Sequence, residues 1–472
     1  MKRKNTFLMI LLLIFLATRL LFLGSGLNVL EPDEEDYRQI AQSAANGWPL
    51  YWQGKPYFEK FPLFIYLGFF LGEAFPRLFR IGPYVNLRLI SIISCFGLAL
   101  LFLKYINRKI NKEVAFVSTL FLILNPLLLF YSRQGTYESF YLFFGFLFFY
   151  FFEKYKKQIN LKRGLFLAVL LALAVLSKHI NILLLALPGF YFLKAFVKKN
   201  RDDIYFLTII LLSLLFAILP LLPVYLYSKS LILDQFIGVP RQFFIKNPRT
   251  FLAIFWEYLK VSPFWLSWPI FIGSFLGIVL SFKNFARNLS WLLLLLIGGI
   301  YINSYYVNAR SFIFIIPYLM IGLSLFLQKL KKIKLYKLIL IMLLVFTALQ
   351  AKISFESTLH KGVEASLERV KQVKRQTDLP VFATFEEDKL SEIAGFDIRL
   401  LTSEASQSAI ILIDQRKTEL MLNLESPEYQ EAEKTLDWIL ENKKPIWGYN
   451  DSRPHFPATI LPNKFQIYLN EA

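Results

Sequence analysis

The chain carries an apolar run, FLMILLLIFLATRLLFL at residues 7–23, which is followed at residues 31–37 by EPDEEDY. The apolar run is long enough to cross the roughly 30 Å hydrocarbon core of a bilayer as a helix. The second stretch places five carboxylates within six residues, although the formal net charge of the whole chain is +19. Together the two stretches predict a membrane protein with an acidic site at one face of the membrane.

The composition supports a membrane protein. At 472 residues and 56% hydrophobic content, the chain is too long for one soluble core and too apolar for an ordinary soluble domain. Residues 1–352 contain 39 basic and 14 acidic residues, whereas residues 353–472 contain 14 and 20. The basic excess therefore belongs to the apolar part, where membrane topology explains it without nucleic acid. The single cysteine, Cys95, excludes an intrachain disulfide and a cysteine metal cluster.

We predict eleven transmembrane helices, near residues 7–23, 84–103, 114–131, 138–153, 161–177, 180–197, 204–227, 264–282, 289–306, 312–328 and 336–352. The positive-inside rule tests this count. With an inside N-terminus, each even-numbered helix is followed by a basic inner loop, such as the loop with Arg108 and Lys109 or the loop with Lys283 and Arg287. The charge pattern therefore agrees with eleven helices.

This topology places loops 24–83 and 228–263 and the tail from residue 353 on the outer face. Counting Phe61–Pro76 as a twelfth span would invert every later loop, so we interpret it as an interfacial or re-entrant helix. The alternative of a cleaved signal peptide at residues 7–23 is weakened because a small-residue cleavage pattern is lacking. The predicted domains are a transmembrane domain, 1–352, and an extracytoplasmic α/β domain, 353–472. In the latter we expect strands at Pro380–Phe385 and Ala409–Asp414 and helices at Asp388–Ala394 and Glu428–Leu440.

Polar residues that suit catalysis gather at the predicted outer ends of the helices. They come from five separate connections: Asp33, Glu34, Tyr37, Glu59, Lys60, Arg133, Glu138, Lys178, His179, Asn308 and Arg310. A carboxylate can take a proton from a hydroxyl, and a cluster of cations can hold a phosphate. The joint occurrence of both kinds of group at one membrane depth predicts a reaction site there.

Each of these residues, taken alone, has an ordinary structural explanation. Asp33 is a suitable N-cap for a short helix over residues 34–46, and Glu138 is suited to cap its own span. Lys178 and Arg310 are placed like basic residues that extend from helix ends to the membrane interface. His179 is one of three histidines, and a lone histidine more often makes a structural hydrogen bond than binds a metal.

Other chemistries find little support in the sequence. A G-x-G-x-x-G motif after a strand and a P-loop are both lacking, which argues against a nucleotide cofactor. An H-E-x-x-H motif or two-histidine cluster is also lacking, which argues against catalytic zinc. A divalent ion bound by carboxylates such as Asp33 and Glu59 stays open, so the sequence indicates no certain cofactor.

A family resemblance comes from the first outer loop. Asp33-Glu34-Glu35-Asp36-Tyr37, followed by Gly54-Lys55-Pro56-Tyr57-Phe58-Glu59-Lys60-Phe61-Pro62, resembles that loop in GT-C membrane glycosyltransferases. The most similar branch contains the protein O-mannosyltransferases and the lipid A aminoarabinose transferases. Arg133 with Glu138, Leu176-Ser177-Lys178, and Arg310 with Pro317 resemble later family segments in the same order. The resemblance covers roughly residues 1–330.

The sequence also departs from the family pattern. Asp36 stands where an arginine is common, Ser311 where a tyrosine follows the later arginine, and His179 where a glycine follows the lysine. Phe61 displaces the first proline after Glu-Lys. These departures fall near the expected donor-phosphate contacts, and they leave both the sugar and the acceptor open.

The resemblance implies an integral-membrane, mostly α GT-C helical bundle of about eleven transmembrane helices with a small extracytoplasmic α/β domain. It implies an inverting hexosyl- or pentosyltransferase in the plasma or inner membrane that uses a polyprenyl-phosphate-linked sugar and a cell-envelope acceptor. Asp33 is the expected general base, with Glu34 beside it and Glu138 orienting the acceptor or its loop. The implied phosphate ligands are Lys60, Arg133, Lys178 and Arg310, and the implied pocket residues are Tyr37, Glu59, His179 and Asn308. Loop 228–263, with Trp256 and Tyr258, is a candidate flap over the lipid.

Two other functions stay open at this point. A transporter or flippase for a lipid-linked or acidic solute would share the many spans, but it usually has an internal repeat and polar breaks near the midplane. The sequence has no evident repeat and carries its polar groups at outer helix ends, which favours an enzyme. The third is an inactive member whose tail binds a cell-envelope partner.

Overall fold

The computed structural model describes residues 2–21, 37, 40, 43, 51–52, 55–56, 64, 67, 83–199, 202–219, 248–303, 309–357, 361–384, 390–391, 394–406, 408–414, 427–454 and 462–470. The chain divides into two compact units, one formed mainly by residues up to Lys352 and one formed mainly by Ile353–Ala472. Each unit is described by itself.

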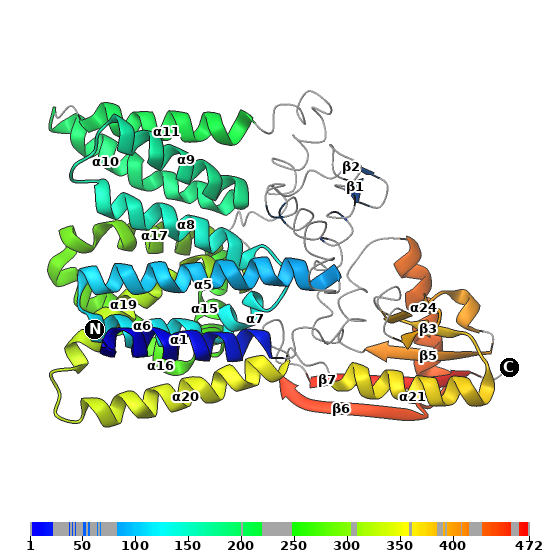
Figure 1. The fold of residues 1–472 in the computed structure, drawn as a ribbon. Coiled ribbons are helices and arrows are strands. Elements are labelled where there is room, and N and C mark those ends of the chain that lie inside the picture. Colours follow the sequence, from blue (N-terminus) through cyan, green and yellow to red (C-terminus); the bar gives the residue numbers. More distant parts are fainter. Residues whose placement is uncertain are drawn as a thin grey trace. The chain divides into compact units, whose positions relative to one another are not determined.

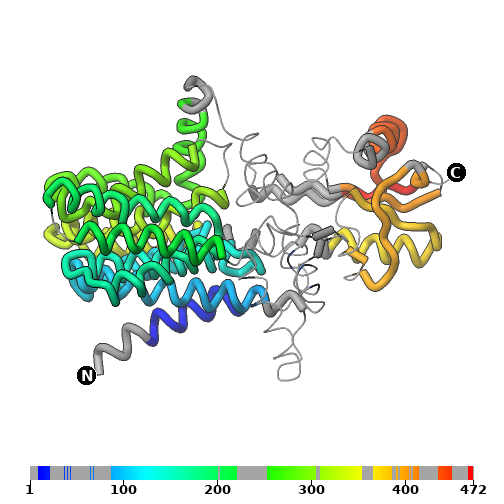
Figure 2. Tube along the Cα trace, turned by 90° about the horizontal axis from the view of Figure 1, so that it is seen from above, coloured from blue at the N-terminus to red at the C-terminus, as the bar shows by residue number. Residues whose placement is uncertain are grey.

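The first unit is a bundle of helices that lie side by side (Figure 1; Figure 2). Its helices are α1 (Lys2–Leu20), α5 (Pro83–Lys109), α6 (Lys112–Ile123), α7 (Pro126–Ser132), α8 (Glu138–Tyr155), α9 (Leu161–Ser177), η3 (His179–Leu185), α10 (Ala186–Val197), α11 (Asp202–Ile218), α15 (Pro248–Leu266), α16 (Trp268–Ser281), η6 (Phe282–Asn284), α17 (Phe285–Asn303), α18 (Ala309–Phe312), η7 (Ile313–Ile315), α19 (Ile316–Leu330) and α20 (Tyr336–Ser357). Every interval in which we predicted a transmembrane helix contains helix, because long apolar runs have few other ways to satisfy their backbone groups in lipid.

Several of these helices are long and apolar enough to cross a membrane. Among the described residues they are Leu87–Lys109, His179–Val197, Trp268–Asn303 and Ala309–Leu330. The pair α6 and α7 also qualifies when taken together, with a 62° bend between its two parts. Asn125 causes this bend because its side chain accepts a hydrogen bond from Leu128 N at 2.9 Å and restarts the helix at Pro126.

Small residues bring α16 and α19 into backbone contact. A Cβ added to Gly277 would lie 1.7 Å from the carbonyl oxygen of Gly322, and one added to Gly273 would lie 2.4 Å from Leu323. Such close approach is typical of membrane helices, where packing of small residues replaces a hydrophobic driving force. α17 packs on α19 and on η7, the turn that leads into α19, where a Cβ on Gly298 would lie 2.7 Å from Ile315. Both α16 and α17 therefore pack against α19.

Part of one predicted outer loop is helical, and its position relative to the membrane stays a prediction. Within the predicted loop 228–263, the residues from Pro248 onward form the helix α15, which continues to Leu266. Its buried residues Tyr258, Ser262 and Trp265 recur at helical spacing, so α15 is held by one packed face. Exposed Glu257 and Lys260, paired at 2.6 Å, interrupt the apolar pattern and made this segment resemble a loop. Residues 228–247 lie outside the described part of the chain.

The first predicted outer loop is described at a few positions. Tyr51–Trp52 (β1) pairs antiparallel with Lys55–Pro56 (β2). Tyr37, Ile40 and Ser43 are helical, which agrees with the predicted helix over 34–46. Within the predicted helix Phe61–Pro76, the described residues Phe64 and Leu67 are also helical, and the others lie outside the described residues.

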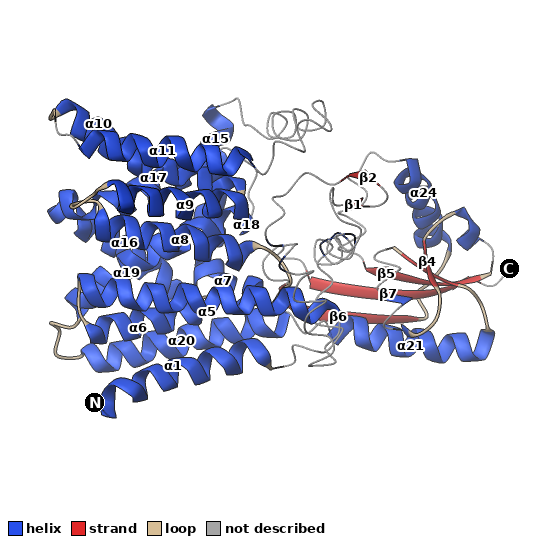
Figure 3. Cartoon of the chain, turned by 45° about the horizontal axis from the view of Figure 1, so that its top comes forward, coloured by secondary structure: helices blue, strands red, loops and turns tan. Residues whose placement is uncertain are grey.

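The second unit is an α/β arrangement around one five-stranded sheet (Figure 3). The strand order is β4 (Ile398–Leu400), β3 (Val381–Ala383), β5 (Ala409–Asp414), β7 (Pro462–Asn470) and β6 (Trp447–Pro454). β3 runs parallel to β4 and β5, whereas β7 runs antiparallel to β5 and β6. The predicted strand Ala409–Asp414 has the bounds of β5, and β3 lies within the predicted strand Pro380–Phe385.

Alternating side chains of the strands face two helices. Val381, Ile410 and Leu412 are buried with residues of α21 (Lys361–Thr377), while Phe382 and Ile411 are buried with residues of α24 (Pro427–Asn442). The two helices therefore cover opposite faces of the sheet, as the period-two side-chain pattern of a doubly covered strand requires. α24 covers the predicted helix Glu428–Leu440. Of the predicted helix Asp388–Ala394, residues 390, 391 and 394 are described, and they are helical.

Candidate functional site

A buried carboxylate between two cations forms the centre of the candidate site. Glu138 is the first residue of α8 and is fully buried. Its Oε1 lies 3.7 Å from Lys178 Nζ and 3.8 Å from Arg310 Nε. Lys178 follows α9 and Arg310 belongs to α18, so three elements distant in the sequence meet here. The structure thus brings together three of the residues predicted as site residues.

A break in the helix positions Lys178. Residues 161–177 are helical, but Lys178 has an extended backbone with φ −167° and ψ 137°, and the 3₁₀ helix η3 follows. Asn181 stabilises the break because its Nδ2 donates to Tyr141 O at 3.0 Å and to Ala174 O at 2.8 Å. The carbonyl of Ala174, in the last turn of α9, also accepts from Lys178 N at 3.3 Å and from Ser177 Oγ at 2.6 Å. The break joins α9 to α8 and holds Lys178 beside the start of α8.

Two tyrosine rings at the start of α8, those of the N-cap residue Tyr137 and of Tyr141, lie close to the lysine. The ammonium of Lys178 lies 4.4 Å from the ring centroid of Tyr137 and 4.6 Å from that of Tyr141. Both distances are in the range of cation–π attraction. The Tyr141 hydroxyl also donates to Arg310 O at 3.1 Å. Tyr141 therefore contacts both basic residues of the site, the Lys178 ammonium through its ring and the Arg310 backbone carbonyl through its hydroxyl.

The predicted pocket residue Tyr37 lies beside this group. Tyr37 is fully buried, and its ring centroid is 5.4 Å from that of Tyr137 and 6.2 Å from that of Phe64. Phe64 in turn lies 5.5 Å from Phe140. A run of aromatic rings thus connects Tyr37 and Phe64, in the predicted first outer loop, to the first turn of α8.

Arg133 has different surroundings from those expected of a phosphate ligand. It is buried, and its guanidinium donates to Thr18 O at 2.9 Å and to Leu21 O at 3.0 Å. These are carbonyls at the C-terminal end of α1, where a cation is favourable. Ser132, the preceding residue, accepts a hydrogen bond from Arg19 Nε at 3.1 Å. The structure therefore gives Arg133 a helix-capping role, and phosphate binding by Arg133 stays a prediction.

The other predicted site residues fall into two groups. His179 is described and is exposed at the start of η3. Asp33, Glu34, Glu59, Lys60 and Asn308 lie outside the described residues. Within the described residues, no group of three or more His, Cys, Asp or Glu side chains is arranged to hold a metal ion. The predicted option of a divalent ion concerns Asp33 and Glu59, so it stays a prediction.

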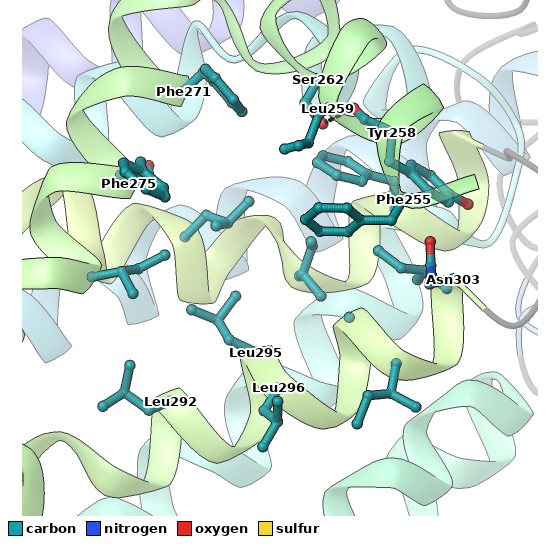
Figure 4. A pocket seen from close by; sticks show the side chains of 18 of the residues that line it. Phe255, Tyr258, Leu259, Ser262, Phe271, Phe275, Leu292, Leu295, Leu296 and Asn303 are labelled. Atoms are coloured by element: carbon teal, nitrogen blue, oxygen red, sulfur yellow. Dashed lines mark hydrogen bonds between the residues drawn. The ribbon is translucent and has the colours of Figure 1, made fainter. Parts of the chain in front are cut away.

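A long apolar groove lies between α16 and α17, with a volume of about 670 Å³ (Figure 4). Ile315 and Leu319 line its floor, and Tyr258 and Ser262 of α15 line one end. Phe275 of α16 and Leu296 of α17 are each 62% exposed, so the groove is open along its side. Phe312 also lines the groove, two residues after Arg310, which places one end of the groove near the cations.

Comparison with known proteins gives the fold. A family model described as dolichyl-phosphate-mannose-protein mannosyltransferase matches residues 66–227. No curated protein sequence matches the chain. The crystal structure of ArnT from Cupriavidus metallidurans bound to undecaprenyl phosphate matches with a TM-score of 0.63 and 11% identity, over 99% of this chain and 98% of that one. The chain has the GT-C glycosyltransferase fold.

More distant GT-C structures match as well. The Archaeoglobus fulgidus oligosaccharyltransferase in complex with zinc and sulfate gives a TM-score of 0.56 at 12% identity, over 98% of this chain and 73% of that one. The archaeal oligosaccharyltransferase AglB from Archaeoglobus fulgidus, in complex with an inhibitory peptide and a dolichol-phosphate, gives 0.52 at 11% identity, over 95% and 73%. Together with the apolar helices, these matches identify a mostly helical, multi-pass membrane protein.

The sequence analysis did not identify several residues of this candidate site. Tyr137 and Tyr141 are four residues apart on either side of Glu138, and this spacing was a usable signal for two rings on one helix face. Asn181 had no comparable signal, because its two carbonyl partners become neighbours only when α8 and α9 pack together.

Proposed function

We propose that this protein is a membrane glycosyltransferase that moves a hexosyl or pentosyl group from a polyprenyl-phosphate donor to a cell-envelope acceptor. The acceptor is a lipid, a glycan or a protein. The observation that carries the proposal is the meeting of an apolar groove and a cation pair at α18. Phe312 lines the groove, and Arg310 of the same short helix lies 3.8 Å from Glu138 beside Lys178. A polyprenyl phosphate matches this arrangement, because its long apolar chain suits the groove and its terminal phosphate suits the cation pair.

The length of the groove suits a lipid tail. Its lining extends from Phe285 to Asn303, the first and last residues of α17. At 1.5 Å per residue this helix is about 27 Å long, close to the roughly 30 Å hydrocarbon thickness of a bilayer. Because membrane lipid is as apolar as the groove, the affinity of the tail for the groove comes from close van der Waals packing against the groove side chains and not from leaving water.

The charges suit the chemistry of the phosphate. The described side chains of the cluster carry two positive charges and one negative charge, and a donor phosphodiester carries one negative charge. When the bond from the anomeric carbon to the phosphate oxygen breaks, the electron pair stays on that oxygen and negative charge grows there. Cations already in place stabilise this growing charge more than they stabilise the donor. Lys178 and Arg310 are therefore the proposed phosphate ligands, with Lys60 as a third.

The proposed reaction is a direct displacement. Asp33 takes the proton from the acceptor hydroxyl, and the resulting oxygen nucleophile attacks the anomeric carbon from the side opposite the phosphate. The new carbon–oxygen bond forms as the old one breaks, polyprenyl phosphate leaves, and the anomeric configuration inverts. Asp33, Glu34 and Lys60 are assigned by family resemblance, because they lie outside the described residues.

The proposed topology has eleven transmembrane helices with the N-terminus inside the cell. This orientation puts the start of α8 and the residues after Lys352 on the outer face of the plasma or inner membrane. Support comes from the basic residues at the opposite ends of the helices, for example Lys154 and Lys156 at the end of α8.

A groove-filling substitution tests the lipid tail. Gly299 lines the groove, and a Cβ added there has no atom within 4 Å, so Gly299→Leu should fill space without a clash. We expect the purified variant in nanodiscs to bind undecaprenyl phosphate about tenfold more weakly and to bind geranyl phosphate as the parent does. Gly189→Leu is the matched control, because Gly189 is equally open but lies on α10. Equal undecaprenyl phosphate binding by all three proteins would refute the groove assignment.

A second experiment tests the reaction itself. Asparagine is also a good N-cap, so Asp33→Asn should preserve expression while lowering the transfer rate by roughly 10²–10⁴. The readout is transfer of radiolabelled sugar from polyprenyl phosphate to envelope material. Transfer at the parental rate would show that Asp33 is not the base. Movement of the lipid-linked sugar across vesicles without transfer would instead support a transporter.

A further inference from the structure

Residues 134–139, which run from the α7–α8 connection into the first turn of α8, contain a cluster of buried polar atoms that have no hydrogen-bond partner among the described residues. Gln134, Thr136, Glu138 and Ser139 are all fully buried. The atoms concerned are Nε2 and Oε1 of Gln134, Oγ1 of Thr136, both carboxylate oxygens of Glu138, and Oγ of Ser139. Glu138 has its two cations at 3.7 and 3.8 Å, whereas the side-chain polar atoms of Gln134, Thr136 and Ser139 find no hydrogen-bond partner in the described part of the chain.

Buried polar groups without partners are costly, and they rarely gather in one place by chance. Other buried atoms without a partner, such as Oγ1 of Thr119, are scattered singly through the described part of the bundle, and some neighbouring polar side chains do find partners. Asn125 donates to Leu266 O at 3.3 Å, and Ser132 donates to Leu129 O at 3.1 Å. Six unsatisfied atoms within six consecutive residues therefore point to a partner from outside the chain.

The backbone of this segment is held in place. Ser91 of α5 donates to Thr136 O at 2.7 Å, and Tyr137 contacts Lys178 through its ring. The side chains of Gln134, Thr136 and Ser139 are thus carried by a fixed backbone that also carries Glu138. Fixed polar groups of this kind are what a binding site requires.

We propose that Gln134, Thr136 and Ser139 form a polar wall that binds the hydroxyl groups of an uncharged sugar on the donor lipid. This inference rests on the proposed function and names the part of the donor that the cations do not bind. Amide and hydroxyl groups both donate and accept hydrogen bonds, as sugar hydroxyls do, whereas Lys178 and Arg310 only donate and suit the phosphate. Glu138 lies between the wall residues in sequence and contacts both cations. In the donor, the sugar is likewise joined directly to the phosphate through the anomeric oxygen.

Entry of the sugar requires some side-chain movement, because the atoms of the wall are shielded from solvent. Rotamer changes of this size are common when a ligand binds. The wall gains partners only when the ligand arrives, so it should favour a sugar-bearing lipid over the bare lipid phosphate.

Thr136→Val tests the wall because stability and affinity should change in opposite directions. Valine has nearly the shape of threonine and removes the unpartnered hydroxyl, so the ligand-free protein should be equally or more heat-stable. Binding of undecaprenyl-phosphate mannose or glucose should weaken about tenfold, the effect of one lost hydrogen bond. Binding of undecaprenyl phosphate without sugar should stay within twofold of the parent. Ser139→Ala is the second variant, with the same expectation.

Thr119→Val is the matched control. Thr119 of α6 is also buried with an unpartnered hydroxyl, so its substitution should leave both lipid affinities unchanged. If both wall variants weakened the binding of sugar-bearing and bare lipid phosphate equally, or changed neither affinity, the proposal of a polar wall would be overturned. A fall in heat stability of both wall variants would overturn it too, because it would reveal an existing partner inside the protein. Failure of the parent protein to bind either lipid would count against the proposed function instead.

Discussion

The ion cluster around Glu138 can be tested by a double-mutant cycle with Lys178→Met and Glu138→Gln. The Nζ and Oε1 atoms are 3.7 Å apart. At an effective dielectric constant of about 20, two unit charges at this separation attract each other by about 4 kcal/mol. Arg310 Nε stays 3.8 Å from the same oxygen when the lysine is lost, so part of this attraction is kept.

The two single variants should differ in cost. Lys178→Met leaves a fully buried carboxylate with one cation near it, so we expect a loss of about 2–3 kcal/mol in unfolding free energy. Glu138→Gln leaves two cations whose side chains are 12% and 21% exposed and can turn toward water. Its cost should be lower, about 1 kcal/mol. In the double variant the two effects should not add, with a coupling energy of about 1–3 kcal/mol.

The measurement is denaturant unfolding of the four proteins in bicelles, followed by tryptophan fluorescence. Lys154→Met is a control, because this lysine contacts the rings of Phe151 and Tyr155 at the other end of α8. Additive losses in the cycle, or a larger loss for Glu138→Gln than for Lys178→Met, would refute the assignment of Glu138 as a buried acid held by these cations.

Three further predictions concern packing and the site. Gly277→Ala should destabilise the bundle by about 1–3 kcal/mol, because the added Cβ would clash with the backbone of α19. Gly189→Ala, whose Cβ would have no atom within 4 Å, should instead stabilise it by up to about 1 kcal/mol. Thermal unfolding in detergent measures both effects. Tyr141→Phe keeps the ring beside Lys178 and removes the hydrogen bond to α18, so undecaprenyl phosphate should bind several-fold more weakly in a titration, and unchanged affinity would contradict this role. Leu412→Ala in the central strand β5 should destabilise the C-terminal unit by about 2–5 kcal/mol, seen as faster proteolysis there, in contrast to Ile446→Ala at an exposed position.

The helical bundle could be predicted because its signal is local. An apolar run of about 20 residues can cross a membrane only as a helix or as part of a closed barrel. α8, for example, spans Glu138–Tyr155 where we predicted 138–153, and α9 spans the predicted Leu161–Ser177. α15 was missed because its local signal is weak. Glu257, Lys260 and Pro263 interrupt its apolar pattern, and its buried face becomes evident only from its packing partners.

The site was predicted as a set of residue types at one membrane depth, and only tertiary structure sorted them. Lys178 and Arg133 are equivalent in such a list, but Lys178 lies beside Glu138 and Arg133 caps α1. The difference arises from which helices pack together, and no local pattern specifies that.

The sequence by itself determined that the chain is a multi-pass membrane protein, where most of its described helices lie, and which GT-C branch it resembles. Apolar length and charge pattern act within about 20 residues, so they can be recognised one segment at a time. The tertiary structure decided that Glu138 is shared by cations 40 and 172 residues further along the chain. It also decided that α16 and α17 leave an apolar groove above α19, because glycine contacts between distant helices set how closely each pair approaches.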